Sequence, residues 1–145
     1  MRPTKMVLLP VVSALLLSAC SPAIVEEASP ARFESQVGLQ LFMWPWESIA
    51  AECEQIGNSG IDWILTSPPQ EHIQGDQWWT VYQPVSYEID SRFGNRQQFS
   101  AMVASCAENG VEVIVDAVIN HMSAAASGAG VAGTEFTKYE YPGLY

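Results

Sequence analysis

The sequence predicts an α/β fold in which short parallel strands alternate with amphipathic helices. Two segments carry apolar residues at helical spacing, and short apolar runs of strand length lie before, between and after them. A strand–helix–strand–helix–strand order implies parallel strands joined by right-handed crossovers. It fits either an open doubly wound sheet or the opening of a barrel. The chain has 145 residues, too few for a complete eight-stranded α/β barrel, which needs about 250.

The composition excludes several function classes. The chain is 48% hydrophobic, which excludes wholesale disorder. It has 16 acidic and 6 basic residues and a formal net charge of −10. Phosphate contacts need clustered Lys and Arg, so this charge argues against a nucleic-acid partner. No Gly-x-Gly-x-x-Gly or Walker-type loop follows the first strand, which argues against a nucleotide site.

Residues 1–19 have the pattern of a secretory signal peptide. Arg2 and Lys5 give a positively charged start, and an apolar run of about 12 residues follows at 6–17. Such a run is too short to span a bilayer as a helix, which needs about 20 residues. We therefore expect an exported protein.

The end of the apolar run carries a more specific pattern. Leu17-Ser18-Ala19-Cys20 resembles the bacterial lipobox, in which cleavage leaves a lipidated Cys20 as the new N-terminus. Ser21 favours the outer membrane in an organism that has one. The alternative is an ordinary signal peptide, a free Cys20 thiol and a secreted protein. Residues 20–36, with two prolines and adjacent glutamates, are typical of a tether, so the lipid would be the membrane contact.

The first strand and helix are predicted from residues 37 to 56. Residues 37–43 form an apolar run of strand length, and Pro45 suits the first turn of a helix. Glu47 is well placed for the helix dipole. One buried helical face follows from the spacing i, i+1, i+4, i+7 of Ile49, Ala50, Cys53 and Ile56.

The next elements follow the same alternation. Residues 63–66 form the second strand, and a long loop extends over roughly 68–95. The second helical face consists of Phe99, Met102, Val103 and Cys106. Asn109-Gly110 closes this helix, and 111–115 is a β-branched third strand. The chain beyond Asn120 shows no clear period and is interpreted as a long excursion from that strand.

Cys53 and Cys106 occupy equivalent positions on the two helical faces. Consecutive helices of a parallel α/β layer would be neighbours, and export places both thiols in an oxidising compartment. This reasoning favours a disulfide, with a pair of buried thiols as the alternative. If Cys20 is lipidated, the other two cysteines can pair and no free cysteine remains.

Two clusters of polar and aromatic residues follow strand ends, where α/β barrels carry their function. The first is Trp78-Trp79-Thr80-Val81-Tyr82-Gln83-Pro84, which has three aromatic residues in five positions. Aromatic faces stack on sugar rings and an amide can bond their hydroxyls. The alternative is that these rings pack the loop onto the fold, but for the whole cluster we favour sugar binding.

The second cluster is Asp116-Ala117-Val118-Ile119-Asn120-His121. The third strand delivers Asp116 and His121 to one end of the sheet, and Asn120 offers a hard oxygen suited to Ca²⁺. Taken alone, helix capping or loop bracing explains such residues equally well.

Together these motifs resemble the α-amylase family of glycoside hydrolases. Asp116 to His121 is similar to the family's Asp-x-x-x-Asn-His region at the end of the third barrel strand. The resemblance extends from about Val37 to the last residue. The motifs similar to the animal-type and actinobacterial branch are Ser67-Pro68-Pro69, Trp78-Trp79, Tyr82-Gln83-Pro84-Val85-Ser86-Tyr87 and Asp116 to Met122.

The resemblance implies a fold and a domain organisation. It implies the N-terminal part of a TIM (β/α)8 barrel, with about three strands and two helices in 37–119. Residues 120–145 would begin the family's protruding second domain. It also implies that Cys53 and Cys106 form a disulfide of that branch.

The resemblance further implies substrate-binding roles. Trp78 and Trp79 would line the donor-side sugar subsites of starch, glycogen or maltooligosaccharides. Tyr82 would stack on the ring at the cleavage subsite, Gln83 would hydrogen-bond nearby, and His121 would bind the same sugar.

Two further roles concern Ca²⁺ and the reaction. Asn120 would ligate a structural Ca²⁺, and Asp116 would orient neighbouring polar groups. Family members cleave internal α-1,4-glucosidic bonds with retention, which needs two carboxyl groups about 5 Å apart. In the family these follow the fourth and fifth strands, so we expect them, and the other Ca²⁺ ligands, beyond Tyr145. The acids of the long loop are interpreted as solvated charges: Glu71, Asp76, Glu88 and Asp90.

The sequence is compatible with two functions of different classes. The first is the N-terminal piece of a lipid-anchored α-amylase, which alone would be inactive. The second is a non-catalytic, surface glucan-binding lipoprotein. We favour the first, because three strands of a barrel would leave an open sheet edge and exposed apolar faces.

Overall fold

The computed structural model describes residues 36–141, so the expected signal peptide, Cys20 and almost all of the expected tether lie outside the described residues. Within this described part no helix has the length and apolar character to cross a lipid bilayer. The elements in chain order are β1 (Gly38–Leu41), α1 (Trp46–Asn58), β2 (Trp63–Thr66), the 3-10 helix η2 (Trp78–Tyr82), β3 (Asp90–Ser91), β4 (Gly94–Asn95), α2 (Arg96–Glu108), β5 (Glu112–Val115), β6 (Ser127–Ala129) and β7 (Glu135–Thr137).

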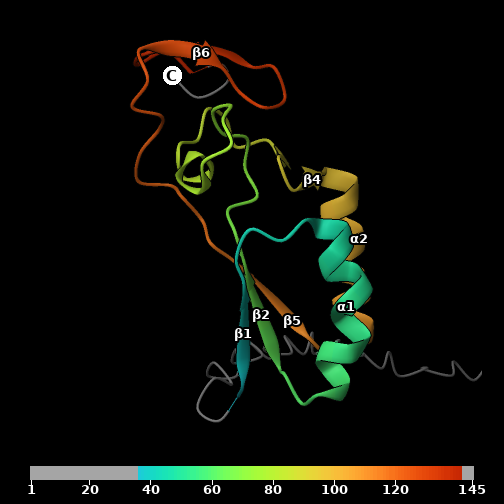
Figure 1. Cartoon of the computed structure of the whole chain (residues 1–145). Helices are drawn as coiled ribbons and strands as arrows, with labels where there is room; N and C mark the ends of the chain where they lie inside the picture. Colours follow the sequence, from blue (N-terminus) through green and yellow to red (C-terminus); the bar gives the residue numbers. More distant parts are fainter. Residues whose placement is uncertain (1–35, 142–145) are drawn as a thin grey trace, which may run out of the picture. The chain divides into compact units, whose positions relative to one another are not determined.

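A three-stranded parallel sheet in the order β1-β2-β5 organises the fold. In its register Leu39 pairs with Ile64, and Ile64 pairs with Val113. Figure 1 shows the three strands side by side, with α1 and α2 together on one side of them. Right-handed crossovers between successive neighbouring strands place both helices on the same face. The predicted parallel α/β arrangement is therefore confirmed.

Helix α1 buries the face that its sequence predicts. Ile49, Cys53 and Ile56 are buried, and Ala50 packs against them. Pro45 lies one residue before the predicted position, as the N-cap, where its missing N–H costs no hydrogen bond. Glu47 is in the first turn, and its carboxylate accepts a 2.8 Å hydrogen bond from Gln98 Nε2 of α2.

Helix α2 begins with a capping box and is joined to α1 by a disulfide. The Asn95 side chain accepts from the Gln98 backbone N–H, and the Gln98 side chain accepts from the Asn95 N–H. The Cys53–Cys106 disulfide closes a separation of 53 residues, which confirms the predicted pairing. In the chain-entropy model a loop of this length contributes about 4 kcal/mol to stability.

The core between the helices and the sheet centres on Trp46, whose side chain is completely buried. Its ring contacts Phe93 and Phe99 at centroid distances of 5.2 and 5.3 Å. The backbone N–H of Trp46 also donates to the Phe93 carbonyl at 3.0 Å. The turn between β3 and β4 is therefore fixed to the start of α1.

Two regions for which the sequence predicts neither helix nor strand contain short elements of secondary structure. The loop after β2 contains η2 and the β3–β4 hairpin, and the segment beyond Asn120 contains the antiparallel β6–β7 hairpin. These elements are two to five residues long, too short to show a hydrophobic period.

The sheet face away from the two helices is only partly covered in the described part of the chain. Trp63, Leu65 and Ile114 are half-buried there. The Trp63 indole lies directly over Gly38, where any Cβ would overlap the ring. On the two outer strands, Leu39 and Val115 lie on the opposite face, with Ile64 and Thr66, and are 38% and 37% exposed.

Candidate functional site

The carboxyl ends of β2 and β5 bring the two predicted clusters to one edge of the sheet. Thr66 pairs with Val115, and the ladder continues as the Asp116 N–H donates to the Thr66 carbonyl at 3.3 Å. From this position the Asp116 carboxylate accepts a 2.8 Å hydrogen bond from the Tyr82 hydroxyl. The loop after β2 is thus joined directly to the end of β5.

The aromatic residues of η2 form an exposed surface on a buried base. Trp78 and Trp79 are 57% and 47% exposed, whereas Thr80 and Val81 of the same helix are buried. The Trp78 ring packs edge-on against Tyr82, with ring centroids 6.1 Å apart. Burial of Thr80 and Val81 holds η2 in place while its two indoles are exposed to solvent, the arrangement that stacking on a sugar requires.

Phe42, in the turn after β1, extends this surface. It is 42% exposed, and its ring centroid lies 6.1 Å from that of Trp78. Three aromatic rings from two strand-end loops are therefore contiguous: Phe42, Trp78 and Tyr82. The sequence does not single out Phe42, because the predicted strand of residues 37–43 includes it, whereas β1 ends at Leu41.

His121 and Gln83 both contact the backbone of Tyr82. His121 Nε2 lies 2.8 Å from the Tyr82 carbonyl, so Nε2 carries the proton and donates it. Gln83 Nε2 donates to the same carbonyl at 3.3 Å, and Gln83 Oε1 accepts from the Ala124 N–H at 2.9 Å. His121 is exposed and close to the aromatic surface, whereas the amide of Gln83 braces the loop. Their contacts to a sugar stay predictions.

The residues available for Ca²⁺ do not form a site by themselves. Ca²⁺ takes six to eight oxygen ligands, and among residues 36–141 no group of three or more His, Cys, Asp or Glu side chains could hold a metal ion. Asn120 is exposed at the sheet edge and can supply one amide oxygen. This donor set does not fit a Ca²⁺ ion without further ligands.

The hydroxyl of Tyr82 is held in its protonated form. Burial, the hydrogen bond to Asp116 and the negative charge of that carboxylate together raise the pKa of Tyr82 to about 12. The phenol therefore remains a hydrogen-bond donor to Asp116 throughout the neutral range.

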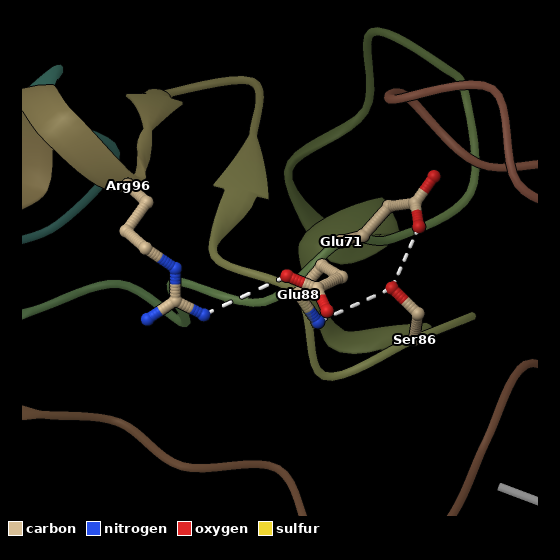
Figure 2. A network of polar contacts seen from close by, with 4 residues as sticks. All are labelled: Glu71, Ser86, Glu88 and Arg96. Atoms are coloured by element: carbon tan, nitrogen blue, oxygen red, sulfur yellow. Dashed lines mark hydrogen bonds and ion pairs between the residues drawn. The ribbon is translucent and has the colours of Figure 1, made fainter. Parts of the chain in front are cut away.

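Glu71 contradicts the interpretation of the loop acids as solvated charges. Its side chain is completely buried, while Asp76, Glu88 and Asp90 are exposed as expected. Figure 2 shows the Ser86 hydroxyl pointing at the Glu71 carboxylate, to which it donates at 2.7 Å. On the surface beside this contact, Glu88 and Arg96 form an ion pair at 3.6 Å.

The second oxygen of Glu71 holds the β6–β7 turn. Oε1 accepts from the backbone N–H groups of Ala132 and Thr134 at 3.1 and 3.2 Å. Gly130 permits this approach, since a Cβ there would overlap the carboxylate. Three hydrogen bonds offset the cost of burying Glu71. The local sequence gives no signal of this role, because both backbone donors lie more than 60 residues away.

Comparison with known proteins places this architecture in a family. The family model described as the catalytic domain of alpha amylase matches residues 46–134. The chain belongs to the α-amylase family of glycoside hydrolases. This family member is 47% identical over 140 residues to an alpha-amylase of Streptomyces violaceus, covering 93% of this chain and 24% of the relative. An alpha-amylase of Thermomonospora curvata is 45% identical over 139 residues, with 90% and 22% covered.

Solved α-amylase structures have the same fold as this family member. Wild-type alpha-amylase I from Eisenia fetida superposes with a TM-score of 0.72 and 39% identity, covering 74% of this chain and 23% of that one. These neighbours are α-amylase barrel enzymes, in agreement with the parallel strands of the chain. The chain spans about a quarter of the length of the curated relatives it matches.

The raised pKa of Tyr82 can be tested by titration. The chain has five tyrosines, and we expect the absorbance of phenolate to include a late ionisation near pH 12 that belongs to Tyr82. Because the folded pKa lies above the ordinary value of 10, the Tyr82 hydrogen bond contributes fully to stability below pH 10. That contribution is lost as the pH rises towards 12. Asp116→Asn should shift the late step to lower pH, and Tyr82→Phe should remove it. A late step whose amplitude is unchanged in Tyr82→Phe would contradict the assignment.

Proposed function

We propose that the chain forms part of the substrate-binding side of an α-amylase that acts on internal α-1,4-glucosidic bonds of starch, glycogen or maltooligosaccharides. The exposed aromatic surface of η2, joined to the end of β5 by the Tyr82–Asp116 hydrogen bond, carries this proposal. Rigid aromatic faces on a buried base suit the apolar faces of glucose rings. The family match supports this substrate class.

Five of the predicted site residues have a direct role in this proposal. Trp78 and Trp79 stack on the sugars of the donor side, and Tyr82 on the ring at the cleavage subsite. His121, with its Nε2 proton directed at the Tyr82 carbonyl, presents Nδ1 as an acceptor for a sugar hydroxyl. Asp116 fixes the Tyr82 hydroxyl.

The proposed reaction retains configuration and needs two carboxyl groups about 5 Å apart. Asp116 is engaged by Tyr82 at the sheet edge and serves as a positioning group. We therefore assign the nucleophile and the acid/base to polypeptide outside residues 36–141, along with the ligands that would accompany Asn120 at Ca²⁺. In this proposal β1, β2 and β5 are the first three barrel strands, within 37–119, and residues 120–145 begin the protruding domain. The exposed apolar residues of the outer strands support further strand neighbours.

We also propose that the protein is exported and anchored by a lipid on Cys20. In a bacterial host, we expect the original protein to incorporate labelled palmitate. The Cys20→Ala variant should incorporate none and should appear in the medium. Incorporation into the Cys20→Ala variant, or none into the original protein, would contradict the anchor.

Substitution of Trp79 tests the sugar-binding surface. Trp79→Ala removes an exposed stacking face and should weaken maltohexaose binding by about tenfold in titration calorimetry. Tyr87→Ala is the matched control, because Tyr87 is an exposed aromatic residue of the same loop, 44% accessible. Equal affinities for both variants and the original chain would contradict the proposed role.

Hydrolysis by the purified chain is a separate test. Because the proposed carboxyl pair lies outside the described residues, we expect no release of reducing ends from soluble starch above the buffer background. Hydrolytic activity that copurifies with the chain and is abolished by Asp116→Asn would overturn this assignment and make Asp116 a reacting group.

A further inference from the structure

The polar contacts before η2 converge on two backbone carbonyls. The Gln77 carbonyl accepts from the hydroxyl and the N–H of Thr80, at 2.7 and 3.2 Å. The Gly75 carbonyl also accepts from the Thr80 hydroxyl at 3.4 Å. Gln77 is the N-cap of η2 and its side chain makes no capping hydrogen bond. The start of η2 is therefore held through these carbonyls.

Arg92 reaches both carbonyls from a different hairpin. Its Nη1 donates to the Gly75 carbonyl at 3.1 Å and to the Gln77 carbonyl at 3.4 Å. Arg92 lies in the turn between β3 and β4, 15 residues or more along the chain from these carbonyls. A guanidinium directs several donors in a fixed plane, so one side chain can serve two acceptors.

The backbone of Arg92 is itself fixed. Its N–H donates to Nε2 of the buried His72 at 3.3 Å. His72 Nδ1 lies 2.8 Å from the Ile73 carbonyl and donates to it, so the ring is neutral with its proton on Nδ1. Burial, the largest cause, lowers the pKa of His72 and favours this neutral form. The next residue, Phe93, is buried against Trp46.

We propose that Arg92 is a positioning residue for Trp78 and Trp79: its guanidinium fixes the two carbonyls before η2 and so sets the direction of the exposed indoles. It touches no sugar in this arrangement and acts through the backbone at Gly75 and Gln77. Gly75 has φ +144°, a conformation that favours glycine. Arg92 therefore contacts a segment whose backbone conformation is unusual. The consequence for binding rests on the proposed sugar-binding function, whereas the positioning itself does not.

The experiment uses the 145-residue chain with Arg92→Ala, Arg92→Lys and the control Arg96→Ala. Arg96 is also exposed, and its surface ion pair with Glu88 contributes little. Indole N–H resonances of Trp78 and Trp79, assigned by Trp→Phe variants, report positioning without sugar. Titration with maltohexaose reports its consequence.

We expect Arg92→Ala to shift both indole resonances and to weaken maltohexaose binding about five- to tenfold, through a less ordered η2. Arg92→Lys should be intermediate, because an ammonium keeps the charge and several N–H donors but lacks the fixed planar geometry of the guanidinium Nη1. Arg96→Ala should leave both readouts unchanged. Intact far-ultraviolet circular dichroism in every variant establishes that the fold persists, and Arg92→Gln replaces Arg92→Ala if that variant fails this check.

The two readouts separate the two possible failures. Unshifted indoles in Arg92→Ala overturn the positioning role whatever the affinity. Shifted indoles with unchanged maltohexaose affinity overturn the link between positioning and binding. If the original chain and Trp79→Ala both fail to bind maltohexaose, the proposed function fails while the indole resonances still decide the role of Arg92.

Discussion

The parallel register of β2 with β5 is the constraint on which the candidate site depends. Thr66 lies opposite Val115, and one further hydrogen bond, from the Asp116 N–H to the Thr66 carbonyl, ends the ladder. The loop that follows β2 and the segment that begins at Asp116 consequently leave the sheet at the same edge. A slip of one residue would turn Asp116 to the opposite face of the sheet. The Tyr82–Asp116 hydrogen bond would then be lost.

The helices and the loops around this edge of the sheet contribute to the site in different ways. The helix side provides the rigid support: Trp46 packs against Phe93 and Phe99, and the disulfide joins α1 to α2. The loop after β2 provides the exposed aromatic side chains of η2. The β3–β4 turn links the two, since Phe93 is buried in the core while its neighbour Arg92 contacts the carbonyls before η2. Glu71 adds a second link, from the loop to the β6–β7 turn.

The sequence predicts those features whose signal is local or periodic. The helical faces of α1 and α2 follow from a spacing of three to four residues, and the Cys53–Cys106 pairing follows from equivalent positions on those faces. The placement of Trp78 and Asp116 at one edge follows from their positions after successive parallel strands.

The features that the sequence does not reveal depend on distant backbone groups. Glu71 is buried because the N–H groups of Ala132 and Thr134 compensate its carboxylate, and the local pattern contains neither partner. The role of Arg92 is likewise hidden, because a single basic residue in a loop is most often a solvated charge. The backbone contacts of the Gln83 amide, to the Tyr82 carbonyl and from the Ala124 N–H, are hidden in the same way. In each case the partner is a main-chain N–H or carbonyl group. Every residue has such groups, so no sequence motif indicates which one is used.

The most direct test of the account is a residue-by-residue map of where maltohexaose contacts the chain. Backbone and indole chemical shifts of the 145-residue protein would be followed during a titration with the sugar. The account predicts perturbations concentrated in Trp78–Tyr82 and in the segment from Asp116 to His121, with Phe42 at their border. Perturbations confined to other surfaces, or none at saturating sugar, would contradict the claim that this sheet edge binds substrate.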